Sequence, residues 1–390
     1  MRVIYILRGS PGCGKSTWIK DNNLSEYTIC ADDIRLLTQP PIMQVDGKFG
    51  ISQKNDNSVW KTLFSVLEER MKRGELIFVD ATHSKTKDFS KYKTLVEKYR
   101  YRAYCIDFSD VSIEVTKSRN KNRTPSYKVV PENVIDNMYS RFATQKPPNW
   151  CKTIKPSEFY ETFKYEPRDL SKYEKVVLIG DIHGCWEPLN EYFTQNPFNE
   201  NYFYIFLGDW VDRGLQEEQC VEFALSIYNK SNVCMVLGNH DQWTYLYANN
   251  QEKEIFSGEF KKNTTEKLKK FNKSDLREWT RRFAQLCYFK FHENYFLATH
   301  GGLPTLPENL LAIATEQLVK GVGSYEEVDQ CAKIWHETMP KNHYSVVGHR
   351  NPNHLPLQVN SGFFNLDGQV EFGGNLRILE IYNESCCNNS

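Results

Sequence analysis

The chain has 390 residues, a length that suggests about two domains, and 40% hydrophobic and 25% charged residues, the composition of a soluble globular protein. No apolar run approaches the ~20 residues that span a bilayer and no signal-peptide pattern opens the chain, so we expect a cytoplasmic protein with no membrane partner. The formal net charge of zero gives no overall indication of a nucleic-acid partner, and the cysteine spacing is typical of neither a zinc site nor a disulfide framework.

The first part of the chain alternates strand-like and helical segments. Apolar stripes with helical spacing run through Val59, Leu63, Val66 and Leu67, ending near Gly74, and through Tyr92, Leu95, Val96 and Tyr99. The strand-like runs before, between and after them cover residues 3–7, 27–30, 76–80 and 103–108. This order predicts an α/β domain with a parallel sheet and crossover helices over residues 1–145.

A proline-containing break over residues 146–174 predicts a linker, and a second domain follows over 175–390. Its expected strands cover residues 175–180, 202–209, 232–239, 295–302, 344–349 and 376–382. Polar motifs come at the carboxyl ends of several of these strands, where α/β folds gather their chemistry. Residues 242–294 have the pattern of a polar, helical insertion, whose role the sequence leaves open between a substrate wall, a dimer surface and a cover.

The stretch GSPGCGKS at residues 9–16 matches the P-loop pattern and lies between a strand and an expected helix. Glycines at 9, 12 and 14 allow backbone N–H groups to approach phosphates, Lys15 neutralises the β/γ oxygens, and Ser16 can ligate Mg²⁺. The candidate ATP-binding set is Gly9, Gly12, Cys13, Gly14, Lys15, Ser16 and Thr17. The alternative is an ordinary glycine turn.

The segment CADDIR indicates the acceptor side of a phosphoryl transfer. Asp32 directly follows the second strand, where it can accept the proton of an attacking hydroxyl, with Arg35 nearby to hold a phosphate; the alternative for Asp32 is a helix N-cap. Arg119 and Arg123 lie one turn apart at an expected helix end, suited to a lid over the triphosphate or simply solvated.

These residues, with VPENVIDNMYSRF at 130–142, resemble the 5′-hydroxyl polynucleotide kinases of RNA repair over roughly residues 1–145. The resemblance implies that Asp32 is the general base and that Arg35 holds the acceptor's phosphate. It also implies that Arg123, together with Arg119, stabilises the transferring γ-phosphoryl group of ATP.

Five further motifs follow in the second domain: GDIHG, GDWVDRG, GNHD, THGGL and VVGHR. Each comes at the end of an expected strand and supplies oxygen or imidazole ligands, enough for two adjacent divalent metals. The candidate ligands are Asp181, His183, Asp209, Asn239, His300 and His349. Any single histidine of this set could instead be a buried core residue.

This motif series resembles the binuclear metallophosphoesterases, in the branch shared by Ser/Thr protein phosphatases and diadenosine-tetraphosphate hydrolases, and implies a β-sandwich flanked by helices. By the resemblance, Asp181 and His183 hold one metal, Asp209 bridges, and Asn239, His300 and His349 hold the other.

The resemblance also implies that His240 is a general acid oriented by Asp212, and that Arg213 binds a phosphate oxygen. The chain departs from the protein-phosphatase pattern at Asp241, where that branch has Glu, and at Arg350. The ligand set suits Mn²⁺ or Mg²⁺, and its histidines would also accept Fe²⁺ or Ni²⁺.

Together the two halves resemble the kinase and phosphatase modules of the polynucleotide kinase-phosphatases of RNA repair, without a ligase module. This implies an enzyme that uses ATP with Mg²⁺ and two divalent metals to prepare RNA, or DNA, ends. No K-x-D-G nucleotidyltransferase motif is present, so we expect a separate RNA ligase as partner; a homodimer is an open alternative.

Two other functions remain open at this stage. One is a diadenosine-polyphosphate hydrolase or protein phosphatase fused to a small-metabolite kinase. The other is a non-enzymatic, ATP-gated RNA-binding module. Trp150, Trp243 and Tyr245 are candidates for base stacking, with core or hinge positions as the alternative.

Overall fold

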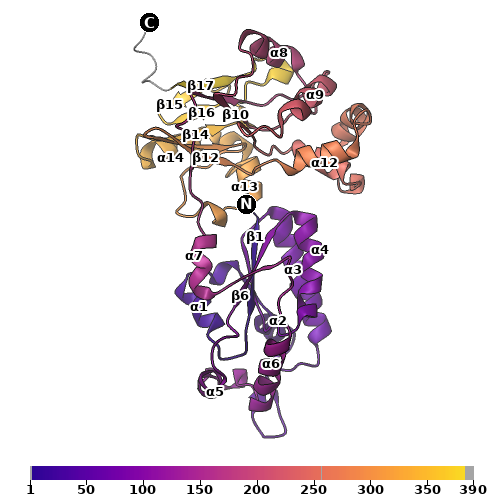
Figure 1. Ribbon diagram of the computed structural model, residues 1–390, viewed down its shortest axis with the longest axis vertical. Helices are drawn as coiled ribbons and strands as arrows, with labels where there is room; N and C mark the ends of the chain where they lie inside the picture. The colour runs from indigo at the N-terminus through magenta and orange to yellow at the C-terminus, as the bar shows by residue number, and fades with distance from the viewer. Residues whose placement is uncertain (1, 256, 383–390) are drawn as a thin grey trace. The chain divides into compact units, whose positions relative to one another are not determined.

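The computed structural model describes residues 2–255 and 257–382 (Figure 1). The chain divides into two compact units. Of the described residues, 2–165 together with 309–315 form unit 1, and 166–255, 257–308 and 316–382 form unit 2. Among the described residues, no helix has the length and apolar character needed to cross a membrane.

Unit 1 is built on a five-stranded parallel sheet in the order β2-β5-β1-β6-β7. Its elements are β1 (Val3–Arg8), α1 (Lys15–Asp21), β2 (Thr28–Cys30), α2 (Ala31–Thr38), β3 (Ile42–Met43), β4 (Phe49–Gly50), α3 (Asp56–Arg73), β5 (Ile77–Asp80), α4 (Ser90–Tyr99), β6 (Arg102–Asp107), α5 (Ile113–Lys121), α6 (Glu132–Thr144), β7 (Lys152–Ile154) and α7 (Phe159–Thr162). The four strands expected from the sequence are confirmed.

Alternating residues of β1 separate the two faces of this sheet. Ile4 and Ile6 pack into the core shared with α2, α3 and α4, whereas Tyr5 packs on the opposite face, with Ile19 of α1 and Phe159 of α7. Both faces are covered because each crossover helix must bury its apolar stripe against the sheet. The carboxyl ends of β1, β2 and β5 therefore meet at one edge, where Leu7 and Cys30 both pair with Asp80.

Two expectations for unit 1 need correction. The segment 146–174, expected to be a linker, instead adds β7 beside β6 and places Phe159 in the core, 5.2 Å from Tyr5 between ring centroids. The prolines break the helical pattern there, but the apolar residues after them still need burial. In α3, Val66 is 40% exposed, because Leu63 and Leu67 occupy the buried stripe that Met71 continues.

Unit 2 contains two sheets, one of four strands in the order β11-β10-β9-β17 and one of six in the order β15-β16-β14-β13-β12-β8. Its elements are β8 (Arg168–Asp169), β9 (Lys175–Ile179), α8 (Trp186–Gln195), β10 (Tyr202–Phe206), α9 (Glu217–Ile227), β11 (Val233–Met235), α10 (Asp241–Ala248), the π-helix η6 (Phe260–Thr264), α11 (Thr265–Leu268), α12 (Lys273–Arg281), β12 (Cys287–Phe291), β13 (Asn294–Thr299), α13 (Thr315–Lys320), α14 (Val328–Thr338), β14 (His343–Val347), β15 (Gln358–Asn360), β16 (Phe363–Asn365) and β17 (Ile378–Tyr382).

The two sheets pack face to face as the expected sandwich. Val176 and Leu178 of β9 lie in the core between the sheets, with Phe289 and Phe296 of the larger sheet. The intervening residues of β9 face the other core, which the flanking helices cover. Alternation along one buried strand thus supplies both cores. The expected α/β fold class, a parallel-sheet domain followed by a helix-flanked sandwich, is confirmed.

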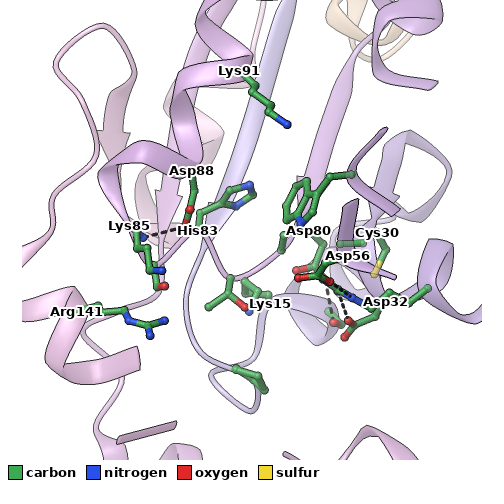
Figure 2. Close-up of a pocket in the computed structure, with 18 of the residues that line it drawn as sticks. Lys15, Cys30, Asp32, Asp56, Asp80, His83, Lys85, Asp88, Lys91 and Arg141 are labelled. Carbon is green, nitrogen blue, oxygen red and sulfur yellow. Dashed lines mark hydrogen bonds and ion pairs between the residues drawn. The ribbon is translucent and has the colours of Figure 1, made fainter. Parts of the chain in front are cut away.

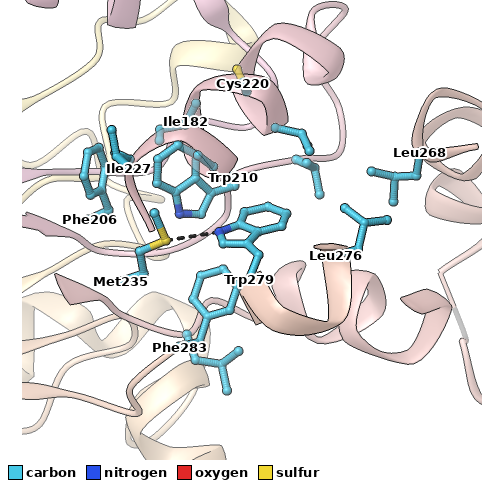
Figure 3. Packing of buried hydrophobic residues seen from close by; sticks show 14 of the residues in the cluster. Ile182, Phe206, Trp210, Cys220, Ile227, Met235, Leu268, Leu276, Trp279 and Phe283 are labelled. Carbon is cyan, nitrogen blue, oxygen red and sulfur yellow. Dashed lines mark hydrogen bonds between the residues drawn. The ribbon is translucent and has the colours of Figure 1, made fainter. Parts of the chain in front are cut away.

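The segment 242–294 is helical only in its first part. It forms most of α10, then η6, α11 and α12, but residues 287–291 form β12, which pairs antiparallel with β13. The strand was missed because its alternating CYFKF pattern is short and follows a polar region. Trp279 of α12 is fully buried beside Trp210, with its indole N–H directed to the Met235 sulfur at 3.1 Å (Figure 3).

Candidate active sites

The glycine-rich loop of unit 1 joins β1 to α1 and encloses the Lys15 side chain. Gly12 has φ +90°, and a Cβ there would lie 2.6 Å from the carbonyl oxygen of Thr116, so no larger residue fits without movement. Lys15 Nζ donates to the carbonyl oxygens of Gly9 at 2.7 Å and Ser10 at 3.2 Å. The ammonium group is therefore held at the centre of the loop, where phosphates bind in P-loop proteins.

Ser16 faces a carboxylate that the sequence analysis did not identify. Its Oγ donates to Asp80 Oδ2 at 3.0 Å, and Asp80 is the last residue of β5. Burial raises the pKa of Asp80, opposed by the charge of Lys15. A hydroxyl and a carboxylate oxygen are hard ligands of the kind that Mg²⁺ prefers, so this pair fits a magnesium ion. The feature of the sequence that could have identified Asp80 is an acidic residue at the end of a buried strand.

Asp32 lies in the first turn of α2, and its carboxylate accepts from Arg35 Nη1 at 2.9 Å. The N-cap alternative for Asp32 is wrong, because Cys30 occupies the N-cap position. Arg35 also donates to Asp56 Oδ1 at 2.7 Å, so two carboxylates hold its guanidinium. The Asp32 side chain is still 39% exposed, and a substrate can reach it.

Two cavities meet at the glycine-rich loop. The first, of about 420 Å³, is lined by Asp32 and, on another side, by the basic residues Lys85 and Arg141 (Figure 2). The second, of about 670 Å³, is lined by residues 14–18 and by Arg119. Both cavities are lined by Pro11, Lys15, Ser16, Arg123 and Lys128. Two substrates can therefore approach Lys15 from different cavities.

The remaining predicted residues of this site lie around the second cavity. Gly12, Gly14 and Thr17 line it, whereas Cys13 is buried and lies under Gly9, whose ideal Cβ would be 2.6 Å from the Cys13 sulfur. Arg119 is on α5, whereas Arg123 follows the end of that helix and donates to the carbonyl oxygen of Lys128.

Asp209 is at the centre of the candidate metal site in unit 2. Its Oδ2 lies 3.4 Å from His183 Nε2 and 3.2 Å from His300 Nε2. Two groups of potential ligand atoms share it: His183, Asp209 and His240 form one, and Asp209, His300 and His349 form the other. A carboxylate common to two ligand groups is the arrangement expected for a bridged pair of metals.

Backbone carbonyls orient the ligand histidines. His300 Nδ1 donates to the carbonyl oxygen of Leu207 at 2.7 Å, which directs Nε2 toward Asp209 and toward Asn239 Oδ1, 3.0 Å away. His183 makes a similar but longer contact, with Nδ1 3.4 Å from the carbonyl oxygen of Val211. Because a carbonyl only accepts, Nδ1 carries the proton in each of these bonds. The lone pair of Nε2 is then available to bind a metal.

Asp181 and His349 approach each other from β9 and β14. The backbone N–H of His349 donates to both Asp181 oxygens, at 3.2 and 3.0 Å. A Cβ on Gly348 would lie 2.2 Å from Asp181 Oδ1, so glycine is needed for this approach. The six predicted ligands thus converge from five segments of the chain, the loops that follow β9, β10, β11, β13 and β14.

The residues of this site fit divalent cations. Buried carboxylates of Asp181, Asp209, Asp367 and Glu371 gather around the four histidines of the two ligand groups. These carboxylates create a strongly negative electrostatic potential. Burial disfavours protonation of His300, but the charges of Asp209 and Asp181 outweigh burial and raise the pKa of His300 to about 10. Burying so many acidic groups is costly unless cations compensate them.

The calcineurin-like phosphoesterase family matches residues 174–382, more than half of the chain. The chain belongs to this family. As a calcineurin-like phosphoesterase it is similar to the symmetrical bis(5′-nucleosyl)-tetraphosphatase of Actinobacillus pleuropneumoniae serotype 5b, with 28% identity over 44% of this chain and 60% of that protein. It is also similar to serine/threonine-protein phosphatase PP1-delta of Caenorhabditis elegans, with 40% identity over 17% of this chain and 22% of that protein.

A third relative is the asymmetrical bis(5′-nucleosyl)-tetraphosphatase PrpE of Bacillus velezensis, 26% identical over 32% of this chain and 55% of that protein. The phosphoesterase thus spans less than two thirds of the length of these relatives. Among solved structures, a Saccharomyces cerevisiae protein serine/threonine phosphatase matches 66% of this chain and 83% of its own at 15% identity, with a TM-score of 0.35.

Residues 4–145 of this phosphoesterase match a second family, described as an AAA domain. The chain therefore joins a kinase-like P-loop domain to a metallophosphoesterase, two domains for the transfer or hydrolysis of phosphoryl groups. The metallophosphoesterase domain implies divalent metals, and the two ligand groups around Asp209 are the candidate site.

Within the first ligand group of the phosphoesterase, His240 is also held by a second carboxylate, that of Asp212. Its Nδ1 donates to Asp212 Oδ2 at 2.7 Å, and Thr264 Oγ1 donates to Asp212 Oδ1 at 2.9 Å. Although burial disfavours the protonated form of His240, Asp209 and Asp212 outweigh it and raise its pKa. Thr264 comes from the segment 242–294, which therefore contributes to the site, a role that no sequence pattern indicated.

Arg213 and Glu371 form the other margin of the site. Arg213 Nη1 is 2.7 Å from Glu371 Oε1 and 3.3 Å from His183 Nε2. Asp212 and Arg213 have φ of 78° and 77°, and His183, Asp209 and His349 also have positive φ. Such strained positions cluster at functional sites, where the surrounding structure enforces them. Glu371 was missed because only an isolated acidic residue marks it in the sequence.

The two departures from the protein-phosphatase pattern have structural roles. Asp241 accepts from the backbone N–H groups of Asp209, Trp210 and Gly238, at 2.9, 3.1 and 2.9 Å, and so ties together the loops after β10 and β11. Arg350 is fully buried and donates to the carbonyl oxygens of Val322 and Ser324.

Proposed function

We propose that the chain is a bifunctional enzyme that prepares nucleic-acid ends for ligation. Unit 1 phosphorylates 5′-hydroxyl ends with ATP, and unit 2 removes 3′-phosphate or 2′,3′-cyclic phosphate. The observation that carries the proposal is the pair of cavities that share Lys15 and Arg123, of which only one is lined by Asp32. A phosphoryl donor and a hydroxyl acceptor can then meet at Lys15 from opposite sides.

In the kinase reaction, Asp32 accepts the proton of the attacking hydroxyl, and Arg35 fixes the orientation of that carboxylate. Lys15 binds the β/γ oxygens of ATP, and Arg119 and Arg123 neutralise charge on the transferring phosphoryl group. Ser16 and Asp80 would hold Mg²⁺, which would neutralise negative charge on the triphosphate. The chain itself thus positions both substrates and takes up the proton.

A polyanionic acceptor is supported by the lining of the first cavity. Lys85, Lys87 and Arg141 line it and also line an adjoining cavity of about 860 Å³ that includes Trp150. Basic side chains around an aromatic ring suit a nucleic-acid backbone with its bases. A small sugar or nucleoside acceptor would leave this adjoining cavity unused.

In the phosphatase reaction, Asp181 and His183 would hold one metal, Asp209 would bridge, and Asn239, His300 and His349 would hold the other. When bound, two divalent cations, with Mn²⁺ the best suited, supply Lewis acidity and a hydroxide nucleophile at neutral pH. His240 donates a proton to the leaving oxygen, and Asp212 keeps its imidazole oriented and protonated. Arg213 binds a phosphate oxygen of the substrate.

The two activities do not oppose each other when they act on different ends of a break. Many ribonucleases leave a 5′-hydroxyl and a 3′-phosphate or cyclic phosphate, whereas ligases need the reverse. The healed RNA, or DNA, would be joined by a separate ligase. Sealing of broken RNA by the pure protein alone would refute that part of the proposal.

The test uses the full chain with ATP, Mg²⁺ and Mn²⁺, and two RNA oligonucleotides, one with a 5′-hydroxyl and one with a 3′-phosphate. Lys15→Ala and Asp181→Ala each serve as the control for the other. We expect Lys15→Ala to lower 5′ phosphorylation by at least about 100-fold and leave 3′ dephosphorylation intact, and Asp181→Ala to do the reverse. Mass measurement of the end groups reads both activities at once.

A second candidate is favoured by the two similar proteins named bis(5′-nucleosyl)-tetraphosphatases. Under it, unit 2 hydrolyses dinucleoside polyphosphates, and unit 1 phosphorylates a small metabolite. Consumption of bis(5′-adenosyl) tetraphosphate by the wild type, with no change at either RNA end, would support this candidate and reject end healing.

A further inference from the structure

Exposed apolar side chains in unit 2 concentrate around the metal site. Within the described part of this unit, the exposed large hydrophobic residues are Leu215, Tyr325, Phe372 and Tyr382. Leu215 is two residues after Arg213, Phe372 follows Glu371, and the Tyr325 ring lies 5.6 Å from the His349 ring. Isolated exposed apolar residues are common, but the rings of Tyr325 and Phe372 beside residues of one polar site indicate a binding surface.

Of these side chains, Phe372 lies beside the residue proposed to bind the substrate. Its ring centroid lies 5.7 Å from the guanidinium carbon of Arg213, the residue that we propose binds the substrate's phosphate. The same guanidinium is 3.3 Å from the metal-site residue His183, so Phe372 is separated from the ligand set by one side chain. Tyr325 is less available, because its hydroxyl accepts from the backbone N–H of Asn351 and its ring packs edge-on against His349.

Consecutive residues of the 3₁₀ turn at Val370–Phe372 point in opposite directions. The Glu371 side chain is only 3% exposed and fixes Arg213 through an ion pair at 2.7 Å, whereas Phe372 is 73% exposed. The turn therefore holds an aromatic ring in solvent beside the phosphate-binding arginine. Exposing that ring costs free energy unless a ligand covers it.

We propose that Phe372 stacks against the nucleobase of the nucleotide whose phosphate is cleaved, so that unit 2 selects nucleotide esters over other phosphate esters. This inference rests on the proposed function of the metal site. Arg213 binds the phosphate. The sugar joins that phosphate to a base, and this base stacks on the Phe372 ring beside Arg213. Stacking accepts any base, because every base has a π face, which suits an enzyme that must process ends of any sequence.

The test compares kcat/KM of full-length variants, with Mn²⁺, on a 3′-phosphorylated oligonucleotide and on β-glycerophosphate, which has no base. We expect Phe372→Ala to lower kcat/KM for the oligonucleotide about 10-fold more than for β-glycerophosphate, mainly through KM, and Phe372→Trp to restore the ratio. A merely structural effect on Arg213 would lower both substrates equally.

Tyr382→Ala is the matched control. Tyr382 is also an exposed aromatic residue beside a cation, with Lys175 Nζ 5.2 Å from its ring centroid. It pairs with Lys175 at the amino end of β9, whereas Asp181 follows the carboxyl end of that strand. Its variant should match the wild type on both substrates.

Bis(5′-adenosyl) tetraphosphate and a phosphoserine peptide complete the substrate set. A selective loss on the tetraphosphate, with no turnover of the oligonucleotide, would support the base contact while rejecting end healing. Equal losses on β-glycerophosphate and on the nucleotide substrates would overturn the base contact while leaving end healing intact. A larger loss on the peptide than on any nucleotide would also overturn the base contact.

Discussion

The role of Asp80 in unit 1 rests on its contact with Ser16. Its carboxylate accepts a hydrogen bond from Ser16, and the two side chains together offer oxygen ligands to Mg²⁺. We expect Asp80→Asn to raise the Mg²⁺ concentration needed for half-maximal kinase activity about 10- to 100-fold, because the amide keeps the shape but loses the charge. Asp33→Asn, on the neighbouring helix α2, is the control, and an unchanged Mg²⁺ requirement for Asp80→Asn would reject this role.

His83 makes the stability of unit 1 sensitive to acid. It is buried, its Nδ1 donates to the carbonyl oxygen of Leu7 at 2.6 Å, and its Nε2 accepts from Tyr92 at 2.9 Å. Burial lowers its pKa from 6.5 to about 4, so the folded state binds fewer protons than the unfolded state between these values. The contribution of His83 to the free energy of unfolding should therefore be at its maximum above pH 6.5. It should fall by about 3 kcal/mol as the pH drops to 4.

The His83→Gln variant isolates this effect from other titrating groups. Both proteins are unfolded with urea at several pH values from 7 to 4. The fraction that unfolds at each pH is read from the loss of kinase activity, which is assayed after return to neutral pH. The wild type should lose more stability than the variant over this range. Parallel pH profiles would show that His83 does not carry the acid sensitivity.

At the scale of elements, the helical segment η6–α11 supports the phosphatase site from outside the motifs. Thr264 at the end of η6 donates to Asp212, which in turn orients His240. Thr264→Val keeps the shape and leaves a carboxylate oxygen without its bond, so we expect about a 10-fold lower phosphatase kcat. Thr265→Val is the control, because the Thr265 hydroxyl donates to the carbonyl oxygen of Phe260 and not to the Asp212 carboxylate.

Steady-state kinetics of both activities in the same preparations check this prediction. The kinase activity of both variants should equal that of the wild type, which shows that the substitutions leave unit 1 unaffected. If Thr265→Val and Thr264→Val have the same phosphatase kcat, the hydroxyl of Thr264 has no part in orienting the Asp212–His240 pair.

At the scale of the whole molecule, the chain completes unit 1 with a segment from far along the sequence. Residues 309–315 belong to unit 1, although the residues on both sides belong to unit 2. Leu311 is 2% exposed in the core that contains Tyr5 and Phe159, and Asn309 donates to the carbonyl oxygen of Phe163 at 2.8 Å. A division of the chain at residue 165 would therefore leave the core of unit 1 incomplete.

Leu311→Ala should lower the unfolding free energy of unit 1 by about 2–5 kcal/mol, the usual cost of a cavity at a buried leucine. Urea denaturation of the full chain, followed by kinase and phosphatase activities, reads the two units separately. Leu318→Ala, at a buried position of unit 2, should shift the phosphatase midpoint instead. An effect of Leu311→Ala on the phosphatase alone would contradict the assignment of the segment.

The amino-acid sequence by itself determined the local features of this protein. The strands carrying the P-loop, Asp181 and His300, and the helices before Gly74 and around Tyr92, follow from periodicity, because apolar spacing records which face of an element is buried. The motifs placed Lys15, Asp209 and the ligand histidines because phosphate and metal chemistry demands particular residues at short spacing.

Only the tertiary structure decided which distant residues meet. Asp80 faces Ser16, Glu371 pairs with Arg213, and Thr264 binds Asp212 because the sheet order and loop paths bring them together, and no short sequence pattern encodes those paths. The same reason applies to residues 309–315, whose burial in unit 1 depends on contacts across more than a hundred residues of chain.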